Sequence, residues 1–351
     1  MYFHGHDRSE ARLGLARQAV DMAVSLAPDL PEVHRTLGIY YYWGLLDYDR
    51  ALQELAIVVK SRPNDSLLAI FLGAVQRRQG KWGQALGNFE KAAKLDPRSS
   101  LSMQCLADTS AILRDYPQAD GYYQRVVSLS PDLTNPYARH IKTLLDWQGD
   151  TQAAREVLNQ ASQHVDLHKD GFLAYYVVLL DILDGDYAAA REFLAMHEAA
   201  LLKTQFFSIP KAQLEAQIAL LEGNHRLAQE SYDAARILLE EEIQKQPQDA
   251  SLHSALGIAY AGLGRNDDAI HEGRMAVNLL PVTKEAWVGL WRLEDLARIY
   301  TMVGEHDAAI DQIEYLVQNP GELSIPLLRI DPTWAPLWEQ ARFKRLVGMK
   351  E

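Results

Sequence analysis

The chain has 351 residues, 48% of them hydrophobic and 23% charged, so it can bury a sizeable core and is not disordered by composition. Its 35 basic and 47 acidic residues give a net charge of -12, which argues against a surface for nucleic acid or an anionic membrane. The single cysteine, Cys105, excludes a disulfide framework and a cysteine-based zinc site, and predicts a cytoplasmic location. The most apolar stretch, Phe172 to Leu180, is too short to cross a membrane.

Small residues and prolines recur along the chain with a period of about 34 residues. The prolines Pro28, Pro63, Pro97 and Pro131 each lie twelve residues after an alanine of a second series. That series consists of Ala16, Ala51, Ala85, Ala119, Ala154, Ala190, Ala228, Ala269 and Ala309. Two interlocked series of this kind indicate an internal repeat.

One period, around residues 70–99, shows why the repeat should be a pair of helices. Ala85 and Phe89 are four residues apart and share one helical face, and Pro97 cannot continue that helix. An earlier helix should end at Gly80, because glycine readily adopts the left-handed conformation that closes a helix. The small residues Gly73 and Ala85 allow the two helices to approach closely.

This pattern resembles the tetratricopeptide repeat, a pair of helices in 34 residues. The large apolar position of that repeat is matched by Leu37, Leu72, Leu106, Ile141, Val177, Leu256 and Leu296. The glycine at the end of its first helix is matched by Gly80, Gly149, Gly185, Gly223, Gly264 and Gly304. The resemblance implies an all-α fold, a right-handed superhelical α-solenoid of helix pairs.

Three segments follow from the repeat pattern. Residues 1–30 are expected to supply a partial repeat with only its second helix, over 12–26, so that the array would start within a repeat and belong to a longer protein. Residues 31–318 are expected to form an array of about eight helix pairs. Residues 319–351 break the period and are expected to form a capping tail, with Trp334, Trp338 and Phe343 as its lid.

The spacing also predicts two long helices that project from the array. Pro247 comes seven residues later than the spacing of the other repeats requires, which adds about two turns to a helix of the sixth pair. The eighth pair should begin with a helix of about 20 residues within 283–304. The exposed apolar face of helix 12–26, or these long helices, could mediate self-association.

The tail carries a second resemblance. It looks like the closing motif of tetratricopeptide arrays in bacterial signalling proteins that also contain a serine/threonine kinase, a nucleotide cyclase or a winged-helix regulator. The matching residues are Leu328, Arg329, Asp331, Pro332, Pro336, Leu337, Arg342, Phe343 and Leu346. Ala335 and the pair Gln340-Ala341 depart from that motif, which weakens the match to a particular subfamily.

No catalytic motif, cofactor motif or metal site is recognisable in the sequence, so we expect a protein that is not an enzyme. His197-Glu198 and His271-Glu272 resemble the start of a zinc-protease motif, but each lacks the second histidine four residues further on. His164 and His168 are four residues apart, yet no third ligand is evident. Cys105 is better explained as a small packing residue than as a nucleophile.

In tetratricopeptide arrays the first helices line a concave groove, and the matching positions are the candidate site. They are Arg35, Tyr42, Trp43, Arg77, Arg78, Gln104, Asp108, Arg139, Trp147 and Tyr175. Arginine and aromatic residues are enriched where proteins bind each other. The competing interpretation is that the aromatic residues pack between repeats and the arginines are solvated. Some tetratricopeptide arrays hold the C-terminal tails of chaperones with lysine and asparagine side chains at fixed groove positions. This sequence lacks those residues, which argues against a chaperone tail as the partner.

The function that best fits is a non-enzymatic scaffold that binds a partner protein or peptide in the concave groove, as the regulatory part of a bacterial signalling protein. One alternative is a regulatory segment of a cyclase, a kinase or a DNA-binding regulator whose output domain is absent here. A weaker alternative is a sensor of a small ligand. We expect no cofactor, and no nucleic-acid or membrane partner for this chain alone.

Overall fold

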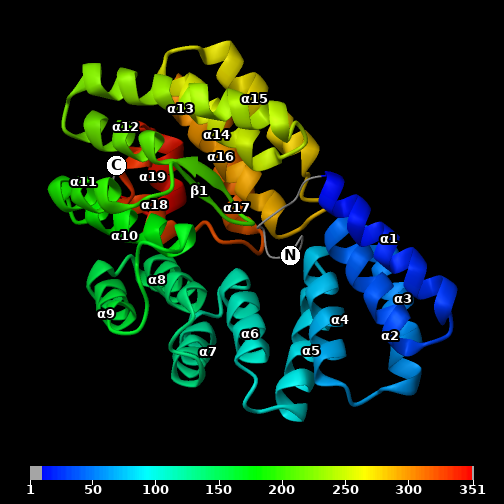
Figure 1. Ribbon diagram of the computed structural model, residues 1–351. Helices are drawn as coiled ribbons and strands as arrows, with labels where there is room; N and C mark the ends of the chain where they lie inside the picture. Colours follow the sequence, from blue (N-terminus) through cyan, green and yellow to red (C-terminus); the bar gives the residue numbers. More distant parts are fainter. Residues whose placement is uncertain (1–9, 350–351) are drawn as a thin grey trace. The chain divides into compact units, whose positions relative to one another are not determined.

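The computed structural model describes residues 10–349, and nearly all of their regular structure is helical (Figure 1). The all-α fold of paired helices that the sequence predicts is confirmed. Packing between the elements divides the chain into two compact units. Unit 1 comprises residues 1–109 and 283–286, and unit 2 comprises residues 110–282 and 287–351. The predicted boundaries after residues 30 and 318 concern the repeat pattern and stay a prediction.

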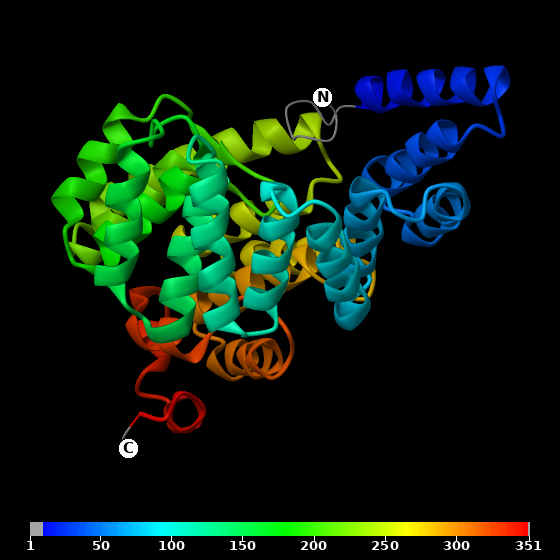
Figure 2. The same ribbon diagram turned by 90° about the horizontal axis from the view of Figure 1, so that it is seen from below.

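In unit 1, successive helices pack as hairpins, α2 with α3 and α4 with α5 (Figure 2). The elements are α1 (Glu10–Leu26), α2 (Pro31–Ile39), the π-helical segment η2 (Tyr40–Leu45), α3 (Tyr48–Ser61), α4 (Ser66–Arg78), α5 (Trp82–Leu95) and all but the last turn of α6 (Ser100–Ile112). Helix α1 contacts α2 and η2. Its residues Leu15, Met22 and Leu26 are exposed, and self-association through them stays a prediction.

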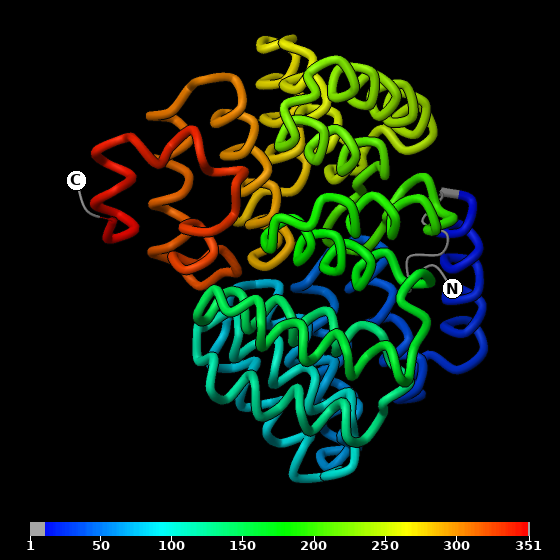
Figure 3. Tube along the Cα trace, turned by 90° about the vertical axis from the view of Figure 1, so that its left-hand side faces the viewer, coloured from blue at the N-terminus to red at the C-terminus, as the bar shows by residue number. Residues whose placement is uncertain are grey.

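In unit 2 the same hairpin packing continues, from α8 with α9 to α16 with α17. The helices are α7 (Tyr116–Leu129), α8 (Thr134–Gln148), α9 (Thr151–Ser162), α10 (Gly171–Leu183), α11 (Tyr187–Met196), α12 (Lys211–Leu221), α13 (His225–Lys245), α14 (Ala250–Gly262), α15 (Asn266–Leu279), α16 (Val288–Val303) and α17 (His306–Gln318). The chain ends with α18 (Ile325–Ile330), the 3-10 helix η3 (Pro332–Leu337) and α19 (Ala341–Val347), which lie beside α17 (Figure 3).

The small residues of the repeat are the points where helices meet. Every alanine of the series from Ala51 to Ala309 is fully buried, whereas Ala16 on α1 is half-buried. A Cβ placed at Gly73 on α4 would lie 2.6 Å from the ring of Phe89 on α5, so only glycine fits this contact without a shift. All six glycines predicted at helix ends have a positive φ, between 66° and 85°. The repeat pattern therefore describes helix contacts correctly.

Three local features differ from the pattern. An antiparallel hairpin of β1 (Leu201–Lys203) and β2 (Ser208–Pro210), which the sequence did not indicate, joins α11 to α12 and pairs Leu202 with Ile209. Helix α13 has 21 residues and is the long helix expected in the sixth pair (Figure 2). Helix α16 has 16 residues instead of about 20, because the chain forms turns before Val288.

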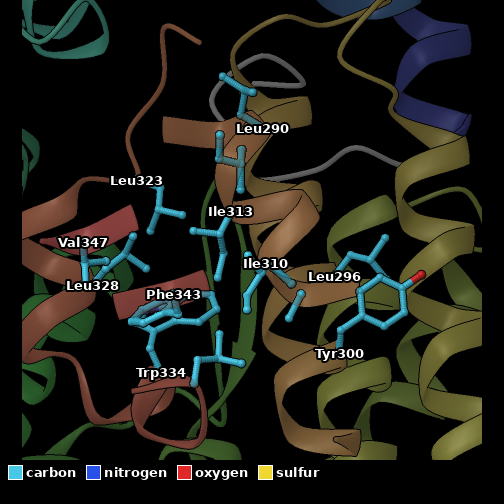
Figure 4. Close-up of a cluster of buried hydrophobic side chains, with 14 residues drawn as sticks. Leu290, Leu296, Tyr300, Ile310, Ile313, Leu323, Leu328, Trp334, Phe343 and Val347 are labelled. Atoms are coloured by element: carbon cyan, nitrogen blue, oxygen red, sulfur yellow. The ribbon is translucent and has the colours of Figure 1, made fainter. Parts of the chain in front are cut away.

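The tail packs its aromatic residues into the last apolar core of unit 2. Trp334 and Phe343 are fully buried against Ile310 and Ile313 of α17, and Trp338 packs against the same cluster (Figure 4). Residues of the closing motif make the bonds that fix this cap. The Arg329 Nε donates to the Val347 carbonyl at 2.6 Å, and the Asp331 carboxylate accepts from the Thr333 N–H at 2.9 Å.

Candidate functional site

Two of the seven groove positions in unit 1 are aromatic residues on η2. Ala51 follows Ala16 by 35 residues, one more than the period of 34, and the π-helical turn Tyr40–Leu45 accommodates the extra residue. Such turns are frequent at functional sites. Tyr42 is buried between Trp43 and Tyr48, with ring centroids 5.5 and 6.0 Å away. Trp43 is half-buried and meets the edge of Phe71 on α4 at 6.3 Å.

Arg78, at the end of α4, binds a non-helical segment of the same unit, residues 283–286. Its guanidinium donates to Glu285 at 2.9 Å and to the Tyr42 hydroxyl at 3.4 Å. The Arg78 carbonyl also accepts the Ala286 N–H at 2.7 Å. Burial would lower the pKa of Arg78, but the Glu285 carboxylate together with Tyr42 and Tyr48 outweighs burial and raises the pKa. Segment 283–286 is therefore fixed to α4 by one ion pair and one main-chain bond.

Arg77 is also buried and paired, with a different set of groups. Its guanidinium lies 3.7 Å from the Asp108 carboxylate and donates to the Thr109 hydroxyl at 3.3 Å. The same group stacks over the ring of Phe89 at 5.3 Å. Arg77 and Asp108 thus join α4 to α6. Of the predicted residues of unit 1, Arg35, Trp43 and Gln104 keep partial exposure.

In unit 2, Arg139 of α8 binds a carboxylate from the segment between α17 and α18 (Figure 1). Its guanidinium donates to Glu322 at 2.8 Å and lies 4.2 Å from the ring centroid of Phe206 and 4.9 Å from that of Trp287. The Trp287 Nε1 also donates to Glu322, at 2.5 Å. Lys142 donates to the Glu322 carbonyl at 2.7 Å and to Asp146 at 2.5 Å.

The charges in this cluster shift the acidities of its members. Burial would raise the pKa of Glu322, but Arg139 and Lys142 outweigh burial and lower it. Burial raises the pKa of Asp146 to about 7 in spite of Lys142. For Lys142 burial would lower the pKa, yet Asp146 and Glu322 raise it. Glu322 is therefore the carboxylate that the cluster holds in its charged form.

Arg114 also binds this segment, although it was not among the residues predicted from the sequence. Its guanidinium donates to the carbonyls of Asn319 at 2.7 Å, Leu316 at 2.9 Å and Leu323 at 3.2 Å. A usable signal was present, because Arg114 precedes Ala119 by the same five residues that separate a helix-end glycine from its alanine in other repeats. Its φ of 61° is uncommon for a residue other than glycine.

The remaining groove positions of unit 2 serve packing. Trp147 is half-buried and stacks on Tyr116, with centroids 6.5 Å apart. Tyr175 is buried beside Phe207 at 5.0 Å, and burial raises the pKa of its hydroxyl. The ten predicted residues are divided between the two units. Seven belong to unit 1 and three to unit 2, and Arg77, Arg78 and Arg139 are paired rather than solvated.

The histidines and the cysteine show no arrangement for metal or covalent chemistry. Within residues 10–349, no group of three or more His, Cys, Asp or Glu could hold a metal ion. His168 instead stacks on Phe193 at 4.3 Å. Burial raises the pKa of the Cys105 thiol to about 11, so the reactive thiolate is disfavoured. No helix in this part of the chain is long and apolar enough to span a bilayer.

Comparison with known proteins identifies the repeats. The family model described as "Tetratricopeptide repeat" matches residues 38–100 and 220–281, so the chain carries such repeats in both units. The Peroxisomal targeting signal receptor of Saccharomyces cerevisiae is 26% identical over 137 residues, which are 39% of this chain and 22% of that protein. The chain therefore spans about a fifth of the length of this relative.

Two solved structures share the fold. A tetratricopeptide repeat protein from Parabacteroides merdae has a TM-score of 0.52 and 13% identity, over 80% of this chain and 98% of that one. Yeast Tom70 has a TM-score of 0.53 and 15% identity, over 94% of this chain and 62% of that one. These likenesses establish a solenoid of tetratricopeptide helix pairs as the fold class.

Proposed function

We propose that the chain is a non-enzymatic interaction scaffold that binds a partner protein or peptide on the first helices of unit 1. The observation that carries the proposal is Trp43, which lies on the π-helical turn, keeps part of its surface exposed and contacts Phe71. Arg35, on the preceding helix, makes a long ion pair with Asp65, 3.8 Å apart. An aromatic anchor and an arginine are the residue types that dominate binding energies.

The chain's own segments indicate the chemistry of the partner. Arg78 binds Glu285, and Arg139 binds Glu322, and in both cases the glutamate lies outside the helices. First-helix arginines of this array therefore suit a carboxylate from a non-helical segment. We expect the partner to offer a non-helical segment with an acidic side chain for Arg35 and an apolar side chain for Trp43.

The comparisons favour the same function. The repeat match over residues 38–100 includes Trp43 on η2, Phe71 on α4 and the whole α4–α5 hairpin. One relative is named a receptor for a targeting signal, which agrees with peptide recognition by related repeats. The closing motif at residues 328–346 supports a regulatory role in a bacterial signalling protein of the cytoplasm. In this chain, residues of that motif also pack into the last apolar core of unit 2.

A site-specific crosslinking experiment tests the proposed surface. The photoreactive residue p-benzoylphenylalanine is placed at Gln104, a first-helix position, and separately at Lys91, an exposed residue of the second helix α5. Irradiation in source cells should give one discrete product from position 104 and none from position 91. Arg35→Glu or Trp43→Ala should remove that product. Equal products from both positions, or a product that survives both substitutions, would refute the surface.

A further inference from the structure

Unit 2 contains a cavity of about 390 Å³ that is separate from the positions discussed above, apart from Tyr175 on its wall. It is bounded by α10, the β1–β2 hairpin, α12, α13, α14, α16 and η3. Its apolar wall includes Phe207, Leu214, Ile258 and Met302. Cavities of this size and lining are typical of sites for small molecules, which begin at about 300 Å³.

Three polar atoms on the wall are buried without a hydrogen-bond partner among residues 10–349. They are the Gln213 Oε1, the Ser254 Oγ and the Arg298 Nε. The side chains of Gln213 and Ser254 are more than nine-tenths buried, with 6% and 2% exposed. An unpaired buried polar group destabilises the fold, so three on one wall favour a ligand that pairs them.

Other polar groups on the wall, by contrast, already have partners. The hydroxyls of Ser208 and Ser251 are 2.7 Å apart, and the Gln217 amide donates to Thr333 at 3.2 Å. If the wall simply carried more polar groups than the protein can pair, the side chains of Ser208, Ser251 and Gln217 would be unpaired as well. The unpaired groups come instead from α12, α14 and α16, so one head group would have to bridge three helices.

The charges on the wall are balanced within the protein. The Arg298 guanidinium donates to Glu294 at 2.7 Å, and Asp295 pairs with Arg292 at 3.1 Å. A ligand carboxylate would face Asp295 on the wall, and a ligand cation would face Arg298 there. Gln213 Oε1 requires a donor and Arg298 Nε an acceptor, while Ser254 accepts either. An uncharged amide carries both kinds of group.

We propose that this cavity binds a small neutral amphiphile, with a carboxamide head bonded to Gln213, Ser254 and Arg298 and an apolar tail along Phe207, Ile258 and Met302. The site is independent of the partner surface on unit 1, so either proposal can fail alone. Binding would order α12, α14 and α16 against one another and thus raise the stability of unit 2.

Calorimetry on the full chain tests the head and the tail separately. The probes are octanamide, octanoate with the same tail but a charged head, and acetamide with the head alone. We expect octanamide to bind at least tenfold more tightly than either of the others. Absence of octanamide binding, or equal affinity for octanoate, would overturn the proposal.

Substitutions then test the named atoms. Gln213→Met removes the unpaired oxygen at similar shape, so it should weaken octanamide binding about tenfold and leave the unliganded melting temperature equal or higher. Ser254→Ala should also weaken binding, whereas Ser231→Ala, at a buried serine outside the cavity, should not. A lower melting temperature for Gln213→Met with unchanged affinity would mean that its oxygen serves the fold alone, and would sink the assignment.

Discussion

Both units use a buried arginine of a first helix to hold a glutamate from a segment outside the helices, but they surround the pair differently. In unit 1, Glu285 has Arg78 as its cationic partner, and the Tyr42 hydroxyl accepts from the same guanidinium. In unit 2, Glu322 meets Arg139 and Trp287 and lies 3.9 Å from Lys142. The cost of removing the glutamate should therefore depend on how many buried cations it leaves behind.

Glu322→Gln should have the largest effect on stability. It keeps the shape of the side chain but leaves Arg139 and Lys142 buried without their shared charge. Loss of one partner of a buried ion pair typically costs about 3–5 kcal/mol. Urea unfolding followed by circular dichroism measures the change. Glu339→Gln is the control, because that glutamate is exposed and its substitution should leave the free energy of unfolding unchanged. A loss below about 1 kcal/mol for Glu322→Gln would contradict the proposed contribution of the cluster to stability.

Glu285→Gln should cost less, roughly 2–3 kcal/mol, because only Arg78 loses its charged partner and its bond to the Tyr42 hydroxyl remains. The same unfolding measurement decides the order of the two variants. If Glu285→Gln lowered the free energy of unfolding as much as Glu322→Gln, the cost would not depend on how many buried cations lose their charged partner.

Ala85→Leu in unit 1 and Ala269→Leu in unit 2 should each destabilise the chain by about 1–3 kcal/mol through overpacking, because both alanines are fully buried where two helices meet. Thermal melts by circular dichroism check this. The matched control is Gly87→Ala on α5, where an added Cβ meets nothing within 4 Å and better helix propensity should stabilise slightly. Unchanged melts for either leucine variant would refute the repeat register in that unit.

Asp146→Asn should produce the smallest effect, visible as a change in pH dependence. The ordinary pKa of an aspartate is 3.8, and burial raises that of Asp146 to about 7 in the folded state. Between pH 3.8 and about 7, the folded chain thus retains a proton on Asp146 that the unfolded chain has released. The stabilisation that this proton gives the folded state is lost progressively as the pH rises to about 7. The stability of the native chain relative to Asp146→Asn should fall over that range and level off above it. Unfolding free energies at several pH values would show a constant difference if the shift were absent.

The sequence predicted the local part of this structure and missed the non-local part. Alanine and glycine spacing located the helix pairs, because Ala85, Gly73 and Gly80 act on neighbours within one repeat. The same spacing carries no information on residues that meet across 183 positions, as Arg139 and Glu322 do. The candidate groove therefore stays a prediction, and the segments that cover Arg78 and Arg139 were not foreseen.

The bonds from Arg114 and Arg139 to the segment before α18 also change how unit 2 should unfold. A repeat array normally behaves as a one-dimensional chain in which each repeat senses only its neighbours and the ends fray independently. In unit 2, Arg114 bonds to carbonyls 202 to 209 residues later, so the start of the unit is tied to the end of α17 and the segment after it, and α7 to α17 lie within a closed circuit. Unfolding of the elements within that circuit must break these bonds first. Unit 2 should thus lose its structure in one cooperative step, and should fold more slowly than an open array of the same length, because the circuit closes only when distant parts of the chain meet.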